Sequence, residues 1–470
     1  MPTPLSVHPD RLFPAESSTR DVCRRLYDQV KDLPIISPHG HVPPVWIADD
    51  VPFRDPASLL ITPDHYVNRH LHAAGVELST LGVGQGDLDE AASRTAWRTL
   101  CEHWYLYAGT PVRYWLENEL VDIFGITQTP SKDNADELYD VVAEWISRPS
   151  SRPRALMDAF DIEFIATTDD PCDTLEHHRK IAEDATFTRR VAPTLRPDKY
   201  LEPARRDWNE STDTLAQVSG ISIESYADWV AAMENRRAYF KAHGAVSTDH
   251  SHRDLRTDVL EAGEAERIFR AARAGIASGA ECTALQRHML TEQARMAADD
   301  GLTMTLHPAV ARNHDPATHR TYGPDVGADI PIAVEAVHAL QPLLSRYGNT
   351  GTFNLVVFTM DETLFSRELG PLAAFYRNFY VGVPWWFIDA PDAIKRFRKA
   401  VSEAAGFYRT SGFIDDTRAF LSIPARHDMS RRLDCVHLAE LVVEHRLSED
   451  EAGKVAHALV AENPRKVFKL

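Results

Sequence analysis

Two histidines separated by one glycine are the first residues in the chain that could hold a metal ion. His39 and His41 end the apolar run LPIISPHGH (33–41). In an extended strand, residues two apart point to the same side, so both imidazoles would face one cavity. Imidazole is the commonest ligand for zinc and similar divalent ions in proteins. The spacing alone is common by chance, and ordinary hydrogen bonding is the alternative role for both side chains.

A carboxylate far along the chain could complete this site. Asp416 lies in the run GFIDDTRAF (412–420), and in a closed cylinder of eight strands the last strand neighbours the first. By the same period-two rule Asp415 would point to the opposite face, so we expect only Asp416 to be a ligand. His307 ends an intermediate run and is either a fourth ligand or a hydrogen-bonding group for substrate. Two imidazoles and one carboxylate leave positions open for water or substrate, as a catalytic ion requires.

Two arginines are placed to bind an anion beside that ion. Arg196 ends the run RVAPTLR, and Arg418 shares a face with Asp416. A guanidinium that points into a cavity binds a carboxylate or a phosphate through two hydrogen bonds. Structural ion pairs are the alternative, with Asp169 or Asp170 for Arg196, and with Asp416 or Asp170 for Arg418.

Two adjacent tryptophans could supply a surface for a sugar. Trp385 and Trp386 end the run NFYVGVPWWF (378–387). An indole ring is large and apolar, with one polar N–H, and can stack on the face of a sugar ring. We expect one of the two to face the cavity and the other to belong to the core.

All these residues lie at the ends of short apolar runs rich in β-branched residues. Patterns of helical period separate most of the runs, and strands that alternate with helices indicate parallel pairing. About eight such units predict a closed (β/α)₈ barrel, an α/β fold whose active site lies where the strands end. An open doubly wound sheet is the alternative, but it would concentrate polar residues at one switch point. The runs are 33–41, 162–170, 190–196, 244–250, 302–308, 353–361, 378–387 and 412–420.

The spacing of the runs divides the chain into four parts. Residues 1–42 would form an N-terminal helix and the first barrel strand, and residues 156–424 the remainder of the barrel. The stretch between them, 43–155, has helical period and many aromatic residues, so we expect a helical insertion that covers the barrel mouth. Residues 425–470 are expected to add a C-terminal helical layer.

The composition is that of a globular protein, and it limits the classes of partner that the protein is expected to bind. The chain has 470 residues, of which 44% are hydrophobic and 26% charged, and its formal net charge is −18. Because a chain with this much negative charge repels the phosphate backbone of nucleic acids, we expect no nucleic-acid partner. No stretch approaches the ~18 apolar residues of a membrane span, and the chain does not open on a signal peptide. With five dispersed cysteines, these features predict a cytoplasmic protein without a membrane partner.

Several motifs taken together resemble one enzyme family. In chain order they are PIISPHGH, DHYVNRHLHAAGV, DIFGI, IATTDDPCDTLEHH, PTLRPDKYL, STDH, LHPAVARN, WWFIDAPD and DDTRAFLS. The combination is similar to the uronate isomerases (glucuronate/galacturonate isomerases) of the amidohydrolase superfamily. The resemblance implies a distorted (β/α)₈ TIM-like barrel with a helical insertion after the first strand. It also implies an aldose–ketose isomerase that converts D-glucuronate or D-galacturonate to D-fructuronate or D-tagaturonate by metal-assisted proton transfer.

The resemblance implies a metal site as well. His39, His41 and Asp416 match the family's metal-site residues, so we expect one divalent ion. Two imidazoles and one carboxylate suit zinc, which we expect first, and also manganese or iron. The first motif here reads SPHGHVPP, where the family more often has an acidic residue and a cysteine around the histidines.

Further residues are implied to bind or transform the sugar acid. Tyr66 matches an active-site tyrosine, with His65 beside it, and together they could shuttle a hydroxyl proton. Asp416 and a hydroxide on the ion are the alternative bases, and Arg418 is a further catalytic candidate that could stabilise oxyanion charge. The candidates for substrate binding are Arg196, Arg418, Trp385, Trp386 and His307.

Two other functions compete with this interpretation. A metal-dependent hydrolase of the same superfamily would cleave an amide, ester or lactone, and its two-metal members generally use a Lys or Glu at the end of strand four. Here the fourth run ends in STDH (247–250), which contains neither Lys nor Glu. This favours a site with one ion and argues against a two-metal hydrolase. A non-catalytic sugar-acid sensor is disfavoured because the set of candidate site residues is complete. The patterns do not decide the uronate epimer or the oligomeric state, for which a homo-oligomer is one option.

Overall fold

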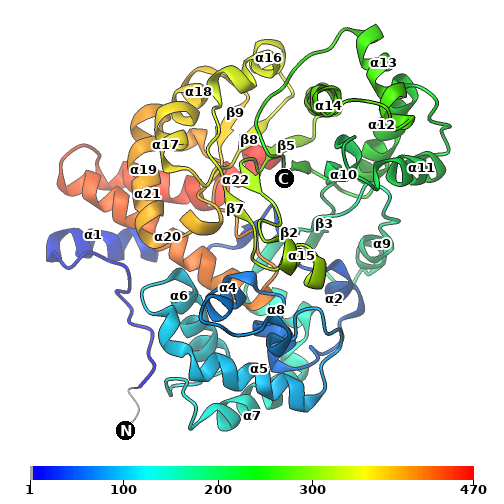
Figure 1. The fold of residues 1–470 in the computed structure, drawn as a ribbon. Helices are drawn as coiled ribbons and strands as arrows, with labels where there is room; N and C mark the ends of the chain where they lie inside the picture. Colours follow the sequence, from blue (N-terminus) through cyan, green and yellow to red (C-terminus); the bar gives the residue numbers. More distant parts are fainter. Residues whose placement is uncertain (1–3) are drawn as a thin grey trace.

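Short parallel strands surrounded by helices form the centre of the protein in this computed structural model, which describes residues 4–470 (Figure 1). The strands pair in two parallel groups, β1–β2–β3 and β4–β5–β8–β9. Most of their residues are buried, as expected where helices cover the outer face and side chains fill the interior. The barrel strands are β1 (Ile35–Ser37), β2 (Ile162–Ala166), β3 (Arg190–Ala192), β4 (Ser247–His250), β5 (Thr303–Leu306), β8 (Leu355–Val357) and β9 (Phe379–Val381).

Isolated backbone bridges join the two groups. Leu195, just beyond β3, pairs in parallel with Thr248 of β4. On the other side, Val381 of β9 pairs in parallel with Thr410, which brings an eighth segment to the sheet. The strands are therefore continuous around the barrel from the first segment to the eighth.

One hydrogen bond links the eighth segment to the first. The backbone N–H of His41 donates to the carbonyl oxygen of Thr417 at 3.0 Å. The predicted strand over 412–420 is wrong in detail, because this segment is irregular backbone. Gly412 and Asp416 take the left-handed conformation, with φ of 77° and 43°, and this interrupts a regular ladder. The predicted fold class, a distorted (β/α)₈ barrel, is confirmed.

Residues 43–155 are mostly helical and lie at one end of the barrel, shown in blue and cyan in Figure 1. Their apolar side chains form a core of their own that continues to the barrel, including the fully buried Trp97 and Trp115. The helices are α2 (Pro44–Asp49), α3 (Pro56–Leu60), α4 (His65–Ala73), α5 (Glu90–Glu102), α6 (Pro111–Asn118), α7 (Ala135–Ile146) and α8 (Pro153–Ala159).

The remaining helices surround the barrel, and their ends follow local sequence signals. α14 begins with a capping box made by Ser278 and Glu281 and ends at Gly301, where the φ of 81° favours glycine. Between β2 and β5 lie α9 (Glu176–Glu183), α10 (Asp198–Leu201), α11 (Trp208–Ser219), α12 (Tyr226–Ala242), α13 (Ala262–Arg273) and α14 (Gly279–Asp300). After β5 come α15 (Pro316–Tyr322), α16 (Val337–Tyr347), α17 (Glu362–Leu364), α18 (Gly370–Phe375) and α19 (Pro391–Ala405).

The first helix packs against helices near the C-terminus. α1 (Ser17–Asp28) lies against the long helix α20 (Ile423–Val443), and α21 (Glu449–His457) and α22 (Asn463–Phe468) follow. A small hairpin, β6 (Val310–Ala311) with β7 (Ile330–Pro331), projects after β5 and was not anticipated. Among residues 4–470, no helix combines the length and the apolar character that a membrane crossing requires.

A single buried arginine ties the insertion to the barrel. Arg426 of α20 lies with its guanidinium carbon 3.6 Å from the ring centre of Trp115 and 4.7 Å from that of Tyr66. One of its terminal nitrogens also lies 3.0 Å from Asp389 Oδ2, in the segment that follows β9. Truncation of this side chain would leave the buried carboxylate of Asp389 and the ring of Trp115 without their cationic partner, whereas Tyr66 would keep Arg69.

A carboxylic acid buried in the insertion is expected to make stability depend on pH. Burial, with a smaller contribution from Asp64, raises the pKa of Glu119 to about 8, although Arg426 acts in the opposite direction. Because the folded state keeps the proton that the unfolded state loses near its ordinary pKa, this group favours folding below about pH 4.5. That contribution is lost as the pH rises toward 8.

We therefore expect Glu119→Gln to stabilise the protein at pH 8 by up to about 4 kcal/mol and to have little effect at pH 4.5. Urea unfolding at both pH values measures the difference. Glu137→Gln, on the exposed face of α7, serves as the control and should change neither value. An equal effect of Glu119→Gln at the two pH values would contradict the raised pKa.

Candidate active site

The two histidines after β1 and the aspartate of the eighth segment meet at one point. His41 Nε2 lies 2.9 Å and His39 Nε2 3.3 Å from the same oxygen, Asp416 Oδ1. Ligand atoms 2.0–2.1 Å from a tetrahedral zinc ion are about 3.3 Å from one another, so the spacing suits a single ion. Thr168, beyond β2, donates its hydroxyl to the carbonyl of Gly40 at 2.9 Å and holds the backbone between the two imidazoles.

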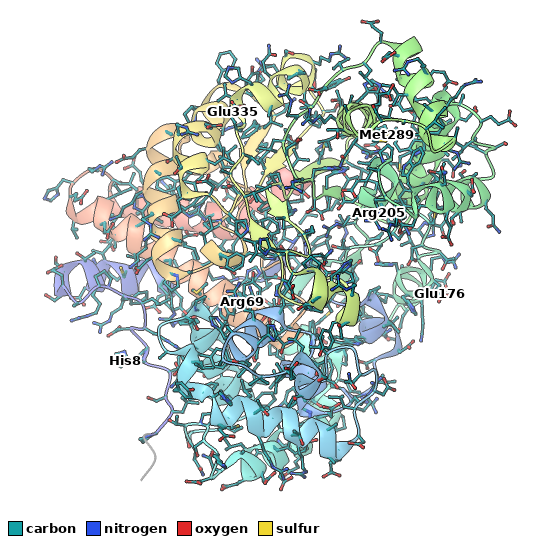
Figure 2. The ribbon with its side chains drawn as sticks, in the orientation of Figure 1. His8, Arg69, Glu176, Arg205, Met289 and Glu335 are labelled. Atoms are coloured by element: carbon teal, nitrogen blue, oxygen red, sulfur yellow. The ribbon has the colours of Figure 1, made fainter. Side chains whose placement is uncertain are left out.

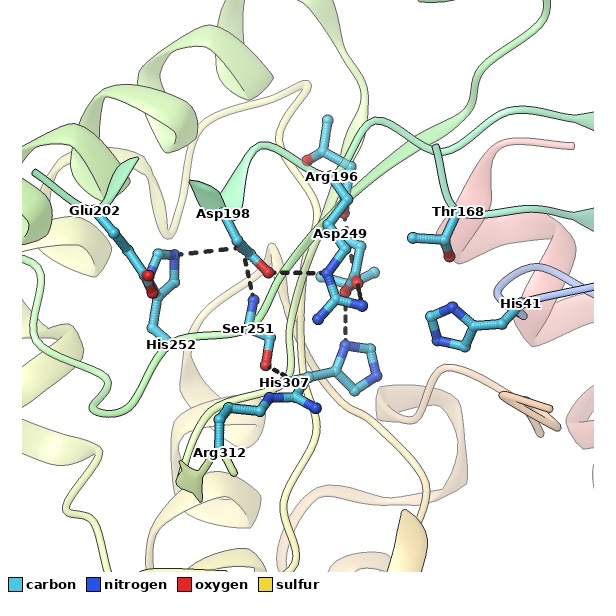
Figure 3. Close-up of polar contacts among 12 residues, drawn as sticks. His41, Thr168, Arg196, Asp198, Glu202, Asp249, Ser251, His252, His307 and Arg312 are labelled. Carbon is cyan, nitrogen blue, oxygen red and sulfur yellow. Dashed lines mark hydrogen bonds and ion pairs between the residues drawn. The ribbon is translucent and has the colours of Figure 1, made fainter. Parts of the chain in front are cut away.

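Asp249, at the end of β4, is a second buried carboxylate in this cluster (Figure 3). Its Oδ1 accepts hydrogen bonds from the Thr305 hydroxyl at 2.9 Å and from His307 Nδ1 at 2.6 Å. Its Oδ2 lies 3.4 Å from Arg196 and 3.9 Å from His39 Nε2. Burial opposes its ionisation, but His307, His39 and Arg196 hold the pKa of Asp249 well below its usual range. The prediction did not include this residue.

The cluster fits a divalent cation. Because Asp249 accepts from Nδ1 of His307, the lone pair of the other nitrogen, Nε2, is free. Within residues 4–470, neither His307 Nε2 nor Asp249 Oδ2 has a hydrogen-bond partner, although both are buried. His39, His307 and Asp416 each offer one ligand atom, and these atoms lie within 4.8 Å of one another. Unpaired buried polar groups cost about 1–3 kcal/mol each, and an ion would remove that cost.

The two predicted arginines lie in the same cavity but have other partners than those considered above. Arg196 donates from Nε to Asp198 Oδ2 at 2.8 Å, and it also approaches Asp249. Arg418 forms an ion pair of 3.0 Å with Asp325, which lies between α15 and β7. Both side chains are partly exposed, Arg196 by 25% and Arg418 by 34%, and both line the cavity that a ligand would occupy.

Helix α4 brings two further predicted residues to the cavity. Asp64 caps this helix by accepting the N–H of Tyr66 at 2.8 Å. Burial raises the pKa of Tyr66 well above its ordinary value, so the phenol stays protonated. Burial and the nearby Arg418 lower the pKa of His65 to about 3, so its imidazole is neutral near pH 7. The His65 ring stands nearly perpendicular to that of Trp386, with 5.5 Å between centroids.

Both tryptophans line the cavity. Trp385 is buried and contacts His307, with ring centroids 4.7 Å apart, and it also packs with Val310 in a small apolar cluster. Trp386 is less buried, and Arg312 lies over its ring at 5.2 Å. The expected division into one cavity residue and one core residue is therefore less sharp than predicted.

The cavity encloses about 510 Å³ between the barrel end and the insertion. It contains every residue predicted for the site. Helix α4 forms one wall of the cavity, and its Arg69 is labelled in Figure 2. The guanidinium carbon of Arg69 lies 5.1 Å from the ring centre of Tyr66. Six lining residues lie outside the prediction. The full lining is His39, His41, Pro63, Asp64, His65, Tyr66, Arg196, Asp249, His307, Arg312, Asp325, Trp385, Trp386, Asp416, Thr417 and Arg418.

Sequence patterns offer unequal help with three of these additional residues, Asp249, Arg312 and Asp325. Asp249 could have been found, because it lies near the end of a barrel strand, as the predicted ligands do. Arg312 and Asp325 belong to the projecting β6–β7 hairpin, whose sequence has no period that would place a side chain over the cavity.

Comparison with known proteins identifies the chain. A model of the family described as glucuronate isomerase matches residues 16–468. The chain belongs to the glucuronate isomerase family. A uronate isomerase of Cutibacterium acnes is 60% identical to it, and one of Corynebacterium efficiens is 48% identical, each alignment covering 100% of both chains. The family predicted from the motifs is confirmed, and with it the enzyme class.

Solved structures of the family have the same fold. A crystal structure of glucuronate isomerase from Caulobacter crescentus has a TM-score of 0.97 at 43% identity, over 99% of this chain and 97% of that one. The uronate isomerase of Thermotoga maritima has a TM-score of 0.92 at 25% identity, over 98% and 99% of the two chains. The overall architecture described above is therefore found in other members of the glucuronate isomerase family.

Asp249 provides a test of the cluster in this family member. We expect Asp249→Asn to weaken metal binding by about 10–100-fold, because the amide no longer orients His307 or balances the adjacent cations. Metal content after dialysis against a weak chelator measures this loss. Asp169→Asn is the matched control, since Asp169 is a buried carboxylate beyond β2 that does not line the cavity. Equal metal retention in the two variants would contradict the role of Asp249.

Proposed function

We propose that this protein interconverts a hexuronate, D-glucuronate or D-galacturonate, with its keto form, D-fructuronate or D-tagaturonate. The observation that carries the proposal is the convergence of an ion-binding cluster, two arginines and a protonated tyrosine on one cavity. Two of the relatives described above are named uronate isomerases, and a hexuronate has the chemistry that this cavity accommodates. It carries a carboxylate for a guanidinium and hydroxyl and carbonyl oxygens for a cation.

Arg196 is the proposed anchor for the substrate carboxylate. Asp198 occupies its Nε, which leaves the terminal nitrogens directed toward the cavity and Asp249. A carboxylate held there places the remainder of the open sugar chain toward the ion-binding residues. Trp386 and His65 form part of the wall along which that chain would lie. Fixing the substrate at its acidic end aligns C1 and C2 for reaction.

Conversion of the aldose to the ketose moves one proton from C2 to C1 and another from the C2 oxygen to the C1 oxygen. A divalent ion on His39, His41 and Asp416, with His307 in reach, would supply Lewis acidity for the developing oxyanion. In the proposed mechanism the carboxylate of Asp416 removes the C2 proton and returns it to C1. The phenol of Tyr66 donates to the substrate oxygens, the neutral imidazole of His65 accepts from them, and Arg418 balances the negative charge.

The identity of the ion and the cellular location of the enzyme are also proposed from the residue types present. Two or three imidazole nitrogens with carboxylate oxygen favour zinc as the ion, with manganese or iron as alternatives. A cytoplasmic location agrees with five dispersed cysteines that are all free thiols in the structure.

The direct test is isomerisation of the two uronates by the purified, zinc-loaded protein. We expect ketose to form from D-glucuronate, D-galacturonate or both, as followed by NMR in D₂O. Removal of metal with a chelator should abolish the activity, and added zinc should restore it. Failure of both sugars to react, together with cleavage of an ester or lactone, would favour the hydrolase instead.

Substitution of the tyrosine tests its part in proton transfer. We expect Tyr66→Phe to lower kcat by about 10²-fold, because a protonated phenol that serves the substrate oxygens is lost. Tyr107→Phe is the control, since Tyr107 is a buried tyrosine of the insertion whose hydroxyl donates to the carbonyl of Val67. Full turnover in Tyr66→Phe would restrict Tyr66 to contact with the substrate.

A further inference from the structure

A second His-x-His pair lies at the end of another barrel strand. His250 is the last residue of β4, and His252 follows two residues later. Asp198, the first residue of α10, approaches both, and the three side chains offer ligand atoms within 4.8 Å of one another. This outer cluster of Asp198, His250 and His252 repeats the residue types and spacing of His39, His41 and Asp416. Figure 3 shows that Asp198 and His252 lie on the far side of Arg196 from His41.

Both histidines of the outer cluster are buried and incompletely bonded. His250 is fully buried and His252 is 6% exposed. Among the described residues, His250 Nδ1 and His252 Nε2 have no hydrogen-bond partner. Each buried imidazole nitrogen left unpaired is unfavourable, and two of them beside one carboxylate require an explanation.

The opposite nitrogen of each ring is held by a neighbour. His250 Nε2 contacts the hydroxyl of Thr248 at 3.2 Å, and His252 Nδ1 lies 3.3 Å from the side-chain nitrogen of Gln286. In metal sites, a ligating histidine commonly donates its second ring nitrogen to an acceptor, and the Thr248 hydroxyl can be that acceptor for His250. The Gln286 nitrogen can only donate, so a cation on His252 Nε2 would require the Gln286 amide to turn and present its oxygen to Nδ1.

The geometry is close to that of a bound ion. The two rings are nearly parallel with centroids 6.2 Å apart, compared with 5.2 Å for His39 and His41. His252 Nε2 lies 4.0 Å from Asp198 Oδ1, which is too long for a hydrogen bond. Ligands of one tetrahedral ion are about 3.3 Å apart, so His252 Nε2 and Asp198 Oδ1 would need to approach each other by less than about 1 Å to share an ion.

Asp198 has capacity for another partner. Its Oδ2 accepts from Arg196 at 2.8 Å, and its Oδ1 accepts from the backbone N–H of Ser251 at 3.0 Å. A carboxylate has about four lone-pair positions, so Oδ1 can also face a cation. The dashed contacts of Asp198 in Figure 3 run to Arg196, Ser251 and His252.

Two residues of the cluster border a second cavity that adjoins the active-site cavity. Asp198 and His252 line a cavity of about 980 Å³, which we call the vestibule. The vestibule shares Arg196, Arg312 and Asp325 with the active-site cavity, and Arg205 in Figure 2 belongs to its wall. Glu202 also lines it and supplies a second carboxylate near His252. A hydrated ion could therefore reach the cluster and retain water in an open position.

We propose that Asp198, His250 and His252 form a second divalent-cation site, distinct from the one at His39, His41 and Asp416. Two imidazoles and one carboxylate define a site for zinc or a chemically similar transition ion, in preference to magnesium or calcium. Asp198 would contact both this ion and Arg196, the proposed binding group for the substrate carboxylate. The ion would therefore lie on the side of Arg196 that faces away from the substrate. It also adds positive charge to the vestibule of a protein whose net charge is −18.

Metal stoichiometry tests this site without reference to turnover. The full-length protein is stripped with a chelator and titrated with Co²⁺, whose visible absorption reports each coordinated equivalent, and bound metal is counted by mass spectrometry. We expect two equivalents in the wild-type protein and one in His252→Gln. His41→Gln should also bind one equivalent, with the absorption of the outer site. Zinc should compete for both positions, whereas a tenfold excess of Mg²⁺ should compete for neither.

His288→Gln is the matched control, because His288 is 7% exposed and accepts the N–H of Leu260 outside the cluster. It should bind two equivalents, and thermal unfolding should show that each variant is folded. Saturation of the wild-type protein at one equivalent overturns the second site, and so does a second equivalent that persists in His252→Gln. The wild-type count requires no variant, and a protein inactive on uronates that binds two equivalents would contradict only the proposed function.

Discussion

The contact between the first and eighth barrel segments is the constraint on which the site depends. Neither His41 nor Asp416 could bind an ion alone, and the N–H of His41 on the carbonyl of Thr417 brings them within 2.9 Å. Asp416 reaches this position through a left-handed backbone that non-glycine residues adopt at a cost of about 1–3 kcal/mol. Such strain persists only where surrounding contacts determine the conformation, and here it directs a carboxylate at two imidazoles.

Charge inside the barrel is arranged against the overall charge of the protein. Asp249 lies among His307, His39 and Arg196, so one buried carboxylate balances several groups that would otherwise repel each other or a metal ion. Arg196 and Arg418 are in turn paired with Asp198 and Asp325. These ion pairs hold the guanidinium groups in place while part of each side chain stays exposed. An anionic ligand could therefore bind the same guanidinium groups, either beside the aspartates or in their place.

The sequence predicts the fold and most of the cavity because regular strands obey simple rules. His39, His41 and His307 were found from the ends of apolar runs, and the neighbouring first and last strands of a closed barrel related them to Asp416. Tyr66 and His65 lie in the helical insertion, where the strand rule does not apply. Only the resemblance of the motifs identified these two residues. Asp249 was overlooked because STDH was considered only for its lack of Lys or Glu.

Other features depend on contacts that no local pattern encodes. The left-handed residues of the eighth segment replace the strand expected there. This segment contacts α20 through Asp415, whose Oδ2 lies 3.1 Å from His427 Nε2, and the first segment through the N–H of His41. The pairing of Arg196 with Asp198, and of Arg418 with Asp325, depends on where two loops turn in three dimensions. Composition sets the number of such charges but not their partners.

The position of the ligands along the chain has a consequence for biosynthesis. The imidazoles of His39 and His41 leave the ribosome early, together with the helices of the insertion, whereas Asp416 and Arg426 emerge in the last part of translation. Until then the nascent polypeptide lacks both the ion site at His39, His41 and Asp416 and the arginine that ties Trp115 to the barrel. Prematurely terminated products would consequently lack the metal centre altogether, and only the finished chain could acquire catalytic competence.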